Sequence, residues 1–314
     1  MPSALLAILC PVSLPLWDIV GVGANAVDRV YVLPASLAEA RPDAKLRILH
    51  HRRSCGGQTA TMLATCRRLG ATAAYIGTIG SNDDGALVRA ELARLDIDLT
   101  YAVGRDGPNP FAVILIEERT GERMVLWDRD DRMRLQPTDV PADVLARARL
   151  VHVDDVDLDA AIAAARAAAR AGVPVTSDIE RAADRVDELI GAVTCPIFAA
   201  PALADLTGIA DPERALRKIR RAHAGLITVT LGADGAMVLD GDRIVHAPGV
   251  AVSAVDTTGA GDVFRGAFAI AWLENRTAAD VLRFANAAAA VSCTRPGAVA
   301  GAPGRAEIDA LLRA

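Results

Sequence analysis

From residue 141 to residue 292 the sequence alternates between short apolar runs and longer amphipathic or alanine-rich stretches. The short runs have the length of buried strands, and they fall at residues 150–153, 173–177, 189–194, 196–200, 226–231 and 235–239. The longer stretches have the length of helices, and they fall at residues 158–171, 212–223, 261–273 and 277–292. Alternation of this kind predicts an α/β fold in which helices cover a mostly parallel central sheet.

The N-terminal half is less regular. Residues 18–28 are typical of a buried strand that ends in a polar turn at Asp28, and residues 33–55 look irregular and basic. The other elements expected here are a helix that ends at residues 69–70, a strand at 73–80, a helix at 83–95 and a hairpin with strands at 111–117 and 123–127.

The antiparallel pieces near residues 29–55 and 100–132 are too small to fold alone. We therefore expect them to form a small β lid on the main sheet. The chain from residue 17 to residue 314 is expected to be one domain that includes this lid.

The first sixteen residues stand apart from that domain. They are apolar and contain Cys10, as a signal peptide or lipoprotein would, but they carry no positive charge and are interrupted by Pro11 and Pro15. We expect a disordered tail or a start assigned too far upstream, with export as the alternative. No later stretch approaches eighteen uninterrupted apolar residues, so no transmembrane helix is expected.

Composition narrows the class of protein. The net charge of −5 argues against a nucleic-acid binder, because no basic face is implied. The five cysteines are scattered and form no CxxC pair, so neither a disulfide framework nor a zinc site is expected. Reduced cysteines suit the cytoplasm.

The stretch after residue 18 also raises a dinucleotide-binding alternative. Gly21 and Gly23 match the first two glycines of a GxGxxG turn. Ala26 stands where the third glycine belongs, and no acidic partner follows at the expected strand end. A Rossmann dehydrogenase is therefore a weak alternative hypothesis.

The string DTTGAGDVFRG at residues 256–266 carries the chemistry. Its glycines let backbone N–H groups approach an anion where an apolar run begins to look helical. An aspartate inside such a turn suits a carboxylate that takes a proton while the amides hold developing negative charge, which suggests phosphoryl transfer. The alternative is an ordinary helix cap.

This string resembles the signature DTxGAGDxFxxG of the ribokinase-like (PfkB) family of sugar kinases, and the resemblance extends from about Trp17 to Leu312. It implies that Asp262 is the general base that deprotonates a sugar hydroxyl. It also implies that the amides of Gly259, Ala260 and Gly261 form the anion hole for the transferring phosphate.

The resemblance implies a sugar site between the main sheet and the lid. Asp28 matches the family aspartate that binds sugar hydroxyls, with a turn cap as the alternative. Gly56 and Gly57 resemble the start of the family's GGxxxN signature, in which Thr61 replaces the asparagine. Threonine keeps a hydroxyl but loses the amide donors, which weakens its case as a direct sugar ligand.

The nucleotide side rests on two segments. The resemblance places Thr230 and Gly232 near the ATP phosphates, and Gly235 in the sharp turn that follows. Asn286, a polar residue on an apolar helix, has small alanines around it that would leave room for a purine. A plain turn and a structural asparagine are the alternatives.

The ions are less clear from the sequence. The family's NxxE motif, which organises Mg²⁺ through water, is absent from residues 198–208, so Mg²⁺ is expected to bind through phosphates and water. The loop at 292–297 resembles one whose carbonyl groups hold a monovalent cation, with an ordinary helix exit as the alternative. The residues of this K⁺ site would be Asp256, Thr258, Ser292, Arg295 and Gly297.

The expected function is an ATP-dependent sugar kinase that phosphorylates a primary hydroxyl. The acidic stretch at residues 151–157 favours a neutral sugar over an anionic one, and the chain looks most similar to ketose kinases such as fructokinase, ketohexokinase and sulfofructose kinase. Phosphorylation of sulfofructose, a nucleoside kinase with a base pocket at Phe111 and Trp127, and a non-catalytic sugar-binding regulator are the alternatives. Exposed lid strands could also pair across a homodimer.

Overall fold

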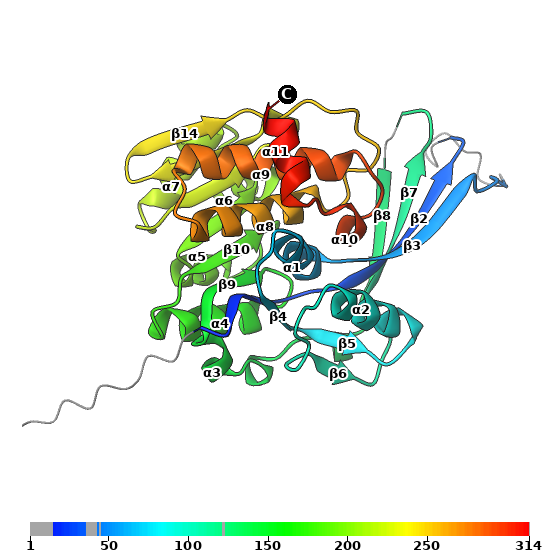
Figure 1. Cartoon of the computed structure of the whole chain (residues 1–314), viewed down its shortest axis with the longest axis horizontal. Coiled ribbons are helices and arrows are strands. Elements are labelled where there is room, and N and C mark those ends of the chain that lie inside the picture. The colour runs from blue at the N-terminus through cyan, green and yellow to red at the C-terminus, as the bar shows by residue number, and fades with distance from the viewer. Residues whose placement is uncertain (1–14, 36–42, 44, 121–122, 314) are drawn as a thin grey trace, which may run out of the picture.

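A computed structural model describes residues 15–35, 43, 45–120 and 123–313. Its main sheet runs through the body of the molecule (Figure 1). The strands of this sheet, in order across it, are β14 (Arg243–Ala247), β13 (Ala236–Asp240), β12 (Ile227–Thr230), β11 (Cys195–Ala199), β10 (Val175–Ile179), β9 (Ala148–Asp154), β1 (Trp17–Val22) and β4 (Ala73–Ile76).

The strands from β12 to β4 are parallel, and β13 and β14 add an antiparallel edge. Neighbouring residues of a strand face opposite layers, so that Ile19 belongs to one apolar cluster and Val20 to the other. This two-sided burial explains why the strands appear in the sequence as short, nearly continuous apolar runs. It also places the carboxyl ends of the parallel strands at one edge, where ligands bind in such sheets.

Helices cover both faces of the sheet. One apolar cluster joins it to α1 (Gln58–Arg68), α2 (Asp83–Arg94), α8 (Ala260–Leu273), α9 (Ala278–Cys293), α10 (Ala298–Gly301) and α11 (Arg305–Arg313). The other cluster joins it to α3 (Ala142–Leu145), α4 (Leu158–Arg170), α5 (Val186–Ala192), α6 (Ala200–Thr207) and α7 (Pro212–Arg220). This arrangement is the α/β fold with a mostly parallel sheet that the alternation predicted.

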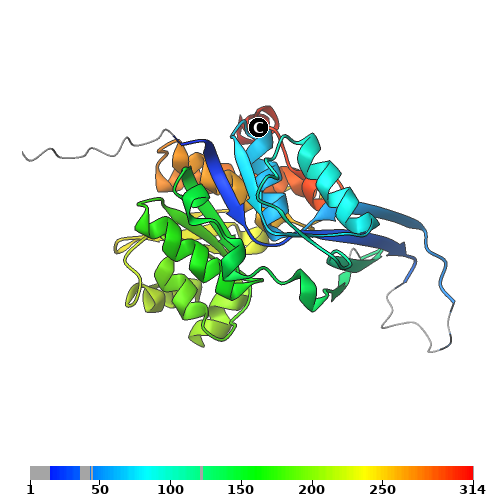
Figure 2. The same cartoon turned by 90° about the horizontal axis from the view of Figure 1, so that it is seen from below.

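A second sheet projects from the main body in both views (Figures 1 and 2). We call it the outer sheet, and its strands in order are β3 (His50–Gly56), β2 (Ala26–Leu33), β7 (Phe111–Glu117) and β8 (Arg123–Asp128). Strands β2 and β7 are parallel, whereas β3 and β8 pair antiparallel with their neighbours. A third, two-stranded sheet joins β5 (Thr78–Gly80) to β6 (Val103–Arg105).

The prediction of a strand at residues 189–194 is wrong, because these residues form most of α5 and the segment directly after it. Asp187 and Glu188 lie in the first turn of this helix, where carboxylates are favourable. Its buried side chains, Val186, Leu189 and Ile190, follow helical spacing. A short apolar run cannot be assigned to strand or helix by periodicity alone.

The first strand is shorter than predicted. Strand β1 ends at Val22, the chain turns at Gly23, and Asp28 lies inside β2 rather than in a turn after the first strand. The region from 33 to 55 is not wholly irregular, because it contains β3. The part of the 100–132 segment that forms β6 pairs with β5 and not with the outer sheet.

Residues 1–14 of the expected tail, with Cys10, lie outside the described residues, while the N–H of Leu16 donates to the Arg147 carbonyl at 2.8 Å. The cysteines at described positions, Cys55, Cys66, Cys195 and Cys293, are free thiols. Among the helices of the described ranges, none has the length and apolar character needed to span a bilayer.

Candidate active site

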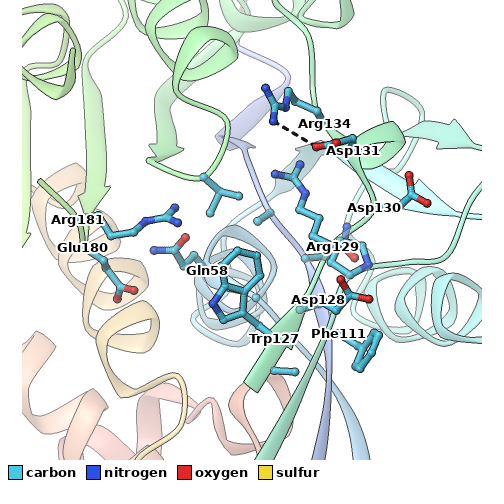
Figure 3. A pocket seen from close by; sticks show the side chains of 17 residues that line it. Gln58, Phe111, Trp127, Asp128, Arg129, Asp130, Asp131, Arg134, Glu180 and Arg181 are labelled. Atoms are coloured by element: carbon cyan, nitrogen blue, oxygen red, sulfur yellow. Dashed lines mark hydrogen bonds and ion pairs between the residues drawn. The ribbon is translucent and has the colours of Figure 1, made fainter. Parts of the chain in front are cut away.

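A cavity of about 580 Å³ lies between the outer sheet and the carboxyl edge of the main sheet (Figure 3). Its lining includes Gly57 and Gln58 at the start of α1, Trp127 of the outer sheet, and Glu180 and Arg181 just after β10. These residues come from segments far apart in the sequence. The volume suits a small organic ligand.

The turn before α8 does not line the cavity itself but lies next to it, because a Cβ on Gly261 would be 4.0 Å from Oε1 of the cavity-lining Glu180. Gly259 has a φ of 76° and caps the helix, and Ala260, Gly261 and Asp262 form its first turn. The N–H of Ala260 donates to the Thr257 carbonyl at 3.3 Å. The N–H groups of Gly261 and Asp262 have no partner within the helix, so they are available to an anion. The carboxylate of Asp256 fixes the turn by accepting from the N–H of Thr258 at 3.0 Å and of Gly297 at 2.8 Å.

Asp262 sits in a crowded electrostatic environment. Its carboxylate is buried, and one oxygen each from Asp262, Asp178 and Glu180 lie within 4.8 Å of one another. Burial raises the pKa of Asp262 well above its ordinary value, the charge of Glu180 raises it further, and the charge of Arg265 opposes both. The group therefore has the raised proton affinity that a base needs to accept a proton.

Asp28 and Gly56 adjoin each other in the outer sheet. Neither Asp28 nor Gly56 lines the cavity, but Asp28 points to the same face of β2 as the cavity-lining Ala26, two residues earlier. A Cβ on Gly56 would lie 2.2 Å from Asp28 Oδ2. Only glycine leaves room for this carboxylate. Burial, followed by the charge of Asp256, raises the pKa of Asp28 to about 6, against an opposing effect from Arg52.

Gly57 has a φ of 94° and opens α1 against a buried polar network that the sequence did not reveal. A Cβ on Gly57 would lie 2.5 Å from the Cα of Asn25. The Asn25 amide donates to the Tyr75 hydroxyl and to the Thr78 carbonyl, each at 2.7 Å, and accepts from Asn109 at 2.9 Å. The network fixes the cavity wall formed by Asn25 and Gly57.

Thr61 does not line the cavity. Its side chain is fully buried, with an Oγ1 that has no hydrogen-bond partner, and its methyl group would lie 3.2 Å from a Cβ on Gly259. Thr61 therefore packs under the amide turn of α8.

The four residues expected at the nucleotide lie around the β12–β14 edge. Thr230 ends β12, and its hydroxyl donates to the Phe198 carbonyl at 3.3 Å. Gly232 and Gly235 both have positive φ, and a Cβ on Gly235 would lie 2.2 Å from the Ala247 carbonyl oxygen. The Asn286 amide donates to the carbonyls of Ala247 and Pro248 at 2.9 and 3.0 Å, so Asn286 holds the end of β14 in place.

The five residues expected at a monovalent cation gather beside the start of α8. Asp256 links Thr258 and Gly297 through its hydrogen bonds. A Cβ on Gly301 would lie 3.3 Å from the Ser292 carbonyl oxygen and 3.7 Å from that of Arg295, so these two oxygens converge. Clustered carbonyl oxygens are suitable ligands for a hard cation.

The three carboxylates of Asp178, Glu180 and Asp262 do not fit a Mg²⁺ site. The guanidinium of Arg265 lies among them, with its Nη2 2.5 Å from Asp178 Oδ1 and 3.9 Å from Glu180 Oε1. A cation already compensates their charge. Mg²⁺ is expected to reach the site on the ATP phosphates.

The comparison with known proteins decides the family. A family model described as pfkB family carbohydrate kinase matches residues 19–305. The chain belongs to the PfkB family of carbohydrate kinases. It is an ATP-dependent phosphotransferase that acts on sugars.

Individual relatives agree with this assignment. The kinase is 31% identical over 270 residues to an ATP-dependent ribose-1-phosphate kinase of Halopiger xanaduensis. The aligned region covers 83% of this chain and 87% of that protein. It is 30% identical to a ribokinase of Haemophilus influenzae, over 80% of this chain and 85% of that protein. A structure of Arabidopsis thaliana ribokinase, complexed with ribose and ATP, shares the fold with a TM-score of 0.82 at 23% identity, covering 96% of this chain and 99% of that one.

The acidic stretch at 151–157 of the kinase does not face the cavity as expected. Asp154 accepts from the Ala24 N–H at 2.7 Å, Asp155 accepts from the N–H groups of Glu180 and Arg181, and Asp157 pairs with Arg129. All three are buried, and of this stretch only Val156 lines the cavity. These aspartates therefore give no reason to exclude an anionic sugar.

Arginines line the cavity of the kinase instead, namely Arg129, Arg134 and Arg181 (Figure 3). The guanidinium of Arg129 donates to Asp157 through two contacts of 2.9 and 2.5 Å and to the Met133 carbonyl at 2.6 Å. The ion pairs of Arg134 and Arg181 are longer, at 3.4 and 3.3 Å, and both guanidinium groups are exposed. These two side chains have the freedom to meet a ligand.

Two further arginines connect the outer sheet to the amide turn of the kinase. Arg52 of β3 pairs with the Asp256 carboxylate, and Arg123 of β8 donates to the Thr257 hydroxyl at 2.8 Å. In the sequence, the 33–55 region is recognisable only as basic, and neither residue has a predicted role. Only the strand pairings reveal that both side chains reach the same turn.

Proposed function

We propose that this kinase transfers the γ-phosphate of ATP to the primary hydroxyl of a small monosaccharide. The observation that carries the proposal is the position of Asp262. It lies in the first turn of α8, where the amides of Gly261 and Asp262 and a buried carboxylate adjoin the cavity-lining Glu180. Asp262 would take the hydroxyl proton, while the amides of Gly259, Ala260 and Gly261 would stabilise charge on the transferring phosphoryl group.

The sugar would bind between Asp28 and the start of α1. Asp28 and the Gly56-Gly57 turn supply a carboxylate and a backbone that can come close to a ligand. The outer sheet would act as a lid that excludes water from the reacting groups. ATP would lie along Thr230, Gly232 and Gly235, on a floor fixed by Asn286. Mg²⁺, when bound, would neutralise phosphate charge.

Free ribose and a ketose such as fructose are the first candidate acceptors, because ribokinases and fructokinases stand among the relatives. The second candidate is a phosphorylated pentose. It is favoured by the exposed guanidinium groups of Arg134 and Arg181 in the cavity and by the ribose-1-phosphate kinase among the relatives.

A panel of acceptors tests this proposal. Ribose, fructose, ribose 1-phosphate, sulfofructose and adenosine would each be incubated with ATP, and the products identified by ³¹P NMR. We expect one sugar to give a primary phosphate ester with the highest kcat/KM. If ribose 1-phosphate prevails, Arg181→Met should raise its KM and not that of ribose. If the enzyme phosphorylates none of these acceptors, the proposal is contradicted. Repeating the panel with tetramethylammonium in place of K⁺ tests the expected monovalent cation site.

We expect Asp28→Asn to raise KM for the sugar by about 10–100-fold, because hydrogen bonds to a charged group are worth about 1.5–3 kcal/mol. The pKa of Asp28 is raised to about 6, so its carboxylate is ionised above that pH and neutral below it. Sugar affinity should therefore fall as the pH drops through about 6, and the variant should lack this dependence. Steady-state KM measured against pH checks both expectations.

Glu117→Gln is the matched control for that change. Glu117 is also a buried carboxylate of the outer sheet, at the far end of β7, and it does not line the cavity. Its KM profile should follow that of the wild type. An Asp28→Asn enzyme with an unchanged KM would remove Asp28 from the sugar site.

We also propose that two copies of the kinase pair through the outer sheet. Strand β8 is its edge, and the side chains of Met124, Val125, Leu126 and Trp127 are 46, 48, 52 and 71% exposed. An exposed apolar edge strand favours pairing with another chain. Sedimentation equilibrium should give a dimer mass, and a monomer at assay and higher concentrations would contradict the proposal.

A further inference from the structure

The face of the main sheet under α8 carries polar residues at alternate positions. His152 and Asp154 of β9 lie beside Thr176 and Asp178 of β10 in register, and Glu180 continues the alternation just beyond β10. Alternate residues of a strand point to one side, so these groups form a single polar layer. The imidazole Nδ1 of His152 lies 2.9 Å from the Thr176 hydroxyl. A layer of this kind inside an apolar core requires charge compensation.

Arg265 of α8 supplies a positive charge to this layer. Only 1% of its side chain is exposed, and its Nη2 contacts Asp178 Oδ1 at 2.5 Å and Glu180 Oε1 at 3.9 Å. Asp178 is equally buried. The guanidinium also lies directly under the amide turn, because a Cβ on Gly261 would be 2.6 Å from Nη1. Arg265 thus touches both the carboxylate cluster and the backbone of the anion hole.

Building on the proposed role of Asp262 as the base, we propose that Arg265 is a positioning residue whose charge favours the ionised form of the Asp262 carboxylate and whose side chain supports the turn at Gly261. Asp178 holds Arg265 in place from β10. Arg265 makes its ion pairs with Asp178 and Glu180, so it acts on Asp262 through the shared cluster.

The charges that face Asp262 show why a cation is needed there. Glu180 and Asp178 approach it from β10, Asp154 from β9 and Asp28 from β2, and all of them disfavour a further negative charge. Burial, then Arg265, lowers the pKa of His152 to about 3, so that imidazole remains neutral. Arginine stays protonated at any working pH. Arg265 is therefore the group near Asp262 that favours its ionised form.

The alternative is that Arg265 and Asp178 form a structural ion pair without influence on the base. The pH profile of kcat/KM separates the two, because its acid limb reports ionisation of the base in the free enzyme. We expect Arg265→Met to move this limb upward by about 1–3 pH units. Arg265→Lys keeps a positive charge and should move it by less. Arg276→Met, which removes a half-buried arginine beyond the C-terminal end of α8, should leave it unchanged.

A double variant keeps the test decisive if Arg265→Met does not fold. Asp178→Asn with Arg265→Met removes both partners, and loss of a complete buried ion pair is often tolerated. We expect a folded enzyme whose acid limb lies above that of Asp178→Asn alone, because Asp178→Asn by itself removes a negative charge beside Asp262. A double variant with the same limb as Asp178→Asn, or a folded Arg265→Met with a wild-type limb, would overturn the proposal.

The same experiments separate this proposal from the proposed function. If Asp262→Asn retained full activity, the assignment of the base would fail and the pH test would lose its basis. If Asp262→Asn were inactive while Arg265→Met kept a wild-type profile, only the role of Arg265 would fail.

Discussion

Asp262→Asn is expected to lower kcat for phosphoryl transfer by about 10²–10⁴-fold, the usual contribution of a positioned base. Asparagine has the same shape as aspartate but cannot take the proton of the sugar hydroxyl. Binding of ATP and sugar should change little, because the amide turn and Asp28 are untouched. Steady-state kinetics and calorimetric titration of both ligands measure the two effects separately.

The same substitution should not destabilise the fold. Burial and the charge of Glu180 raise the pKa of Asp262, so the ionised carboxylate is disfavoured in the native state relative to the unfolded state. At a pH above the ordinary pKa of an aspartate, Asp262 therefore lowers the free energy of unfolding. A neutral amide at this position removes that effect. The melting temperature of the variant near pH 7 should be equal to that of the wild type or higher.

Asp280→Asn is the matched control. Asp280 is the third residue of α9, as Asp262 is the third residue of α8, but it is exposed and accepts from the Thr277 hydroxyl at 2.7 Å. It should alter stability slightly and kcat not at all. An Asp262→Asn enzyme that is folded and retains kcat within a few-fold of the wild type would show that another group is the base.

Gly259→Ala is expected to have the second largest effect, a fall in kcat of about 10²–10³-fold, comparable to the loss of an anion-hole donor. The φ of 76° at Gly259 disfavours any side chain. The added Cβ would also lie 2.6 Å from the Ala298 Cβ and 3.2 Å from Thr61 Cγ2. Relief of these contacts must shift the turn and its amides.

Two further variants separate backbone strain from the clash. Gly172 has a φ of 74° and no atom within 4 Å of an added Cβ, so Gly172→Ala should cost about 1–2 kcal/mol of stability with an unchanged kcat. Ala298→Gly in the Gly259→Ala background should recover part of the lost kcat. Full activity of Gly259→Ala, measured by steady-state kinetics, would exclude this turn from the transition state.

Local sequence signals were sufficient for the catalytic turn and for most of the main sheet. The glycines and aspartate at 256–262 are adjacent in the chain, so their placement at the start of α8 depends on local geometry alone. The mostly parallel character of the sheet follows from the alternation of strands and helices along the chain, although the order of the strands does not. The failure at α5 came from a run too short to show its period.

The polar layer under α8 was not predictable in the same way. His152 and Thr176 come together only through the register of β9 and β10, and Arg265 reaches them from a helix about 90 residues further along. Polar residues at alternate positions in two otherwise apolar runs were the available signal, but period alone does not say which strands are neighbours. The same holds for Arg52, which meets Asp256 across 204 residues of sequence.

The contacts of Arg52 and Arg123 with the turn before α8 have a thermodynamic consequence. A ligand that shifts the outer sheet changes the energy of the turn before α8, and a ligand that shifts this turn changes the energy of the outer sheet by the same amount. If bound sugar changes the affinity for ATP by a given factor, bound ATP must change the affinity for the sugar by the same factor. The two half-sites thus form one thermodynamic cycle, and its closure can be measured from either side.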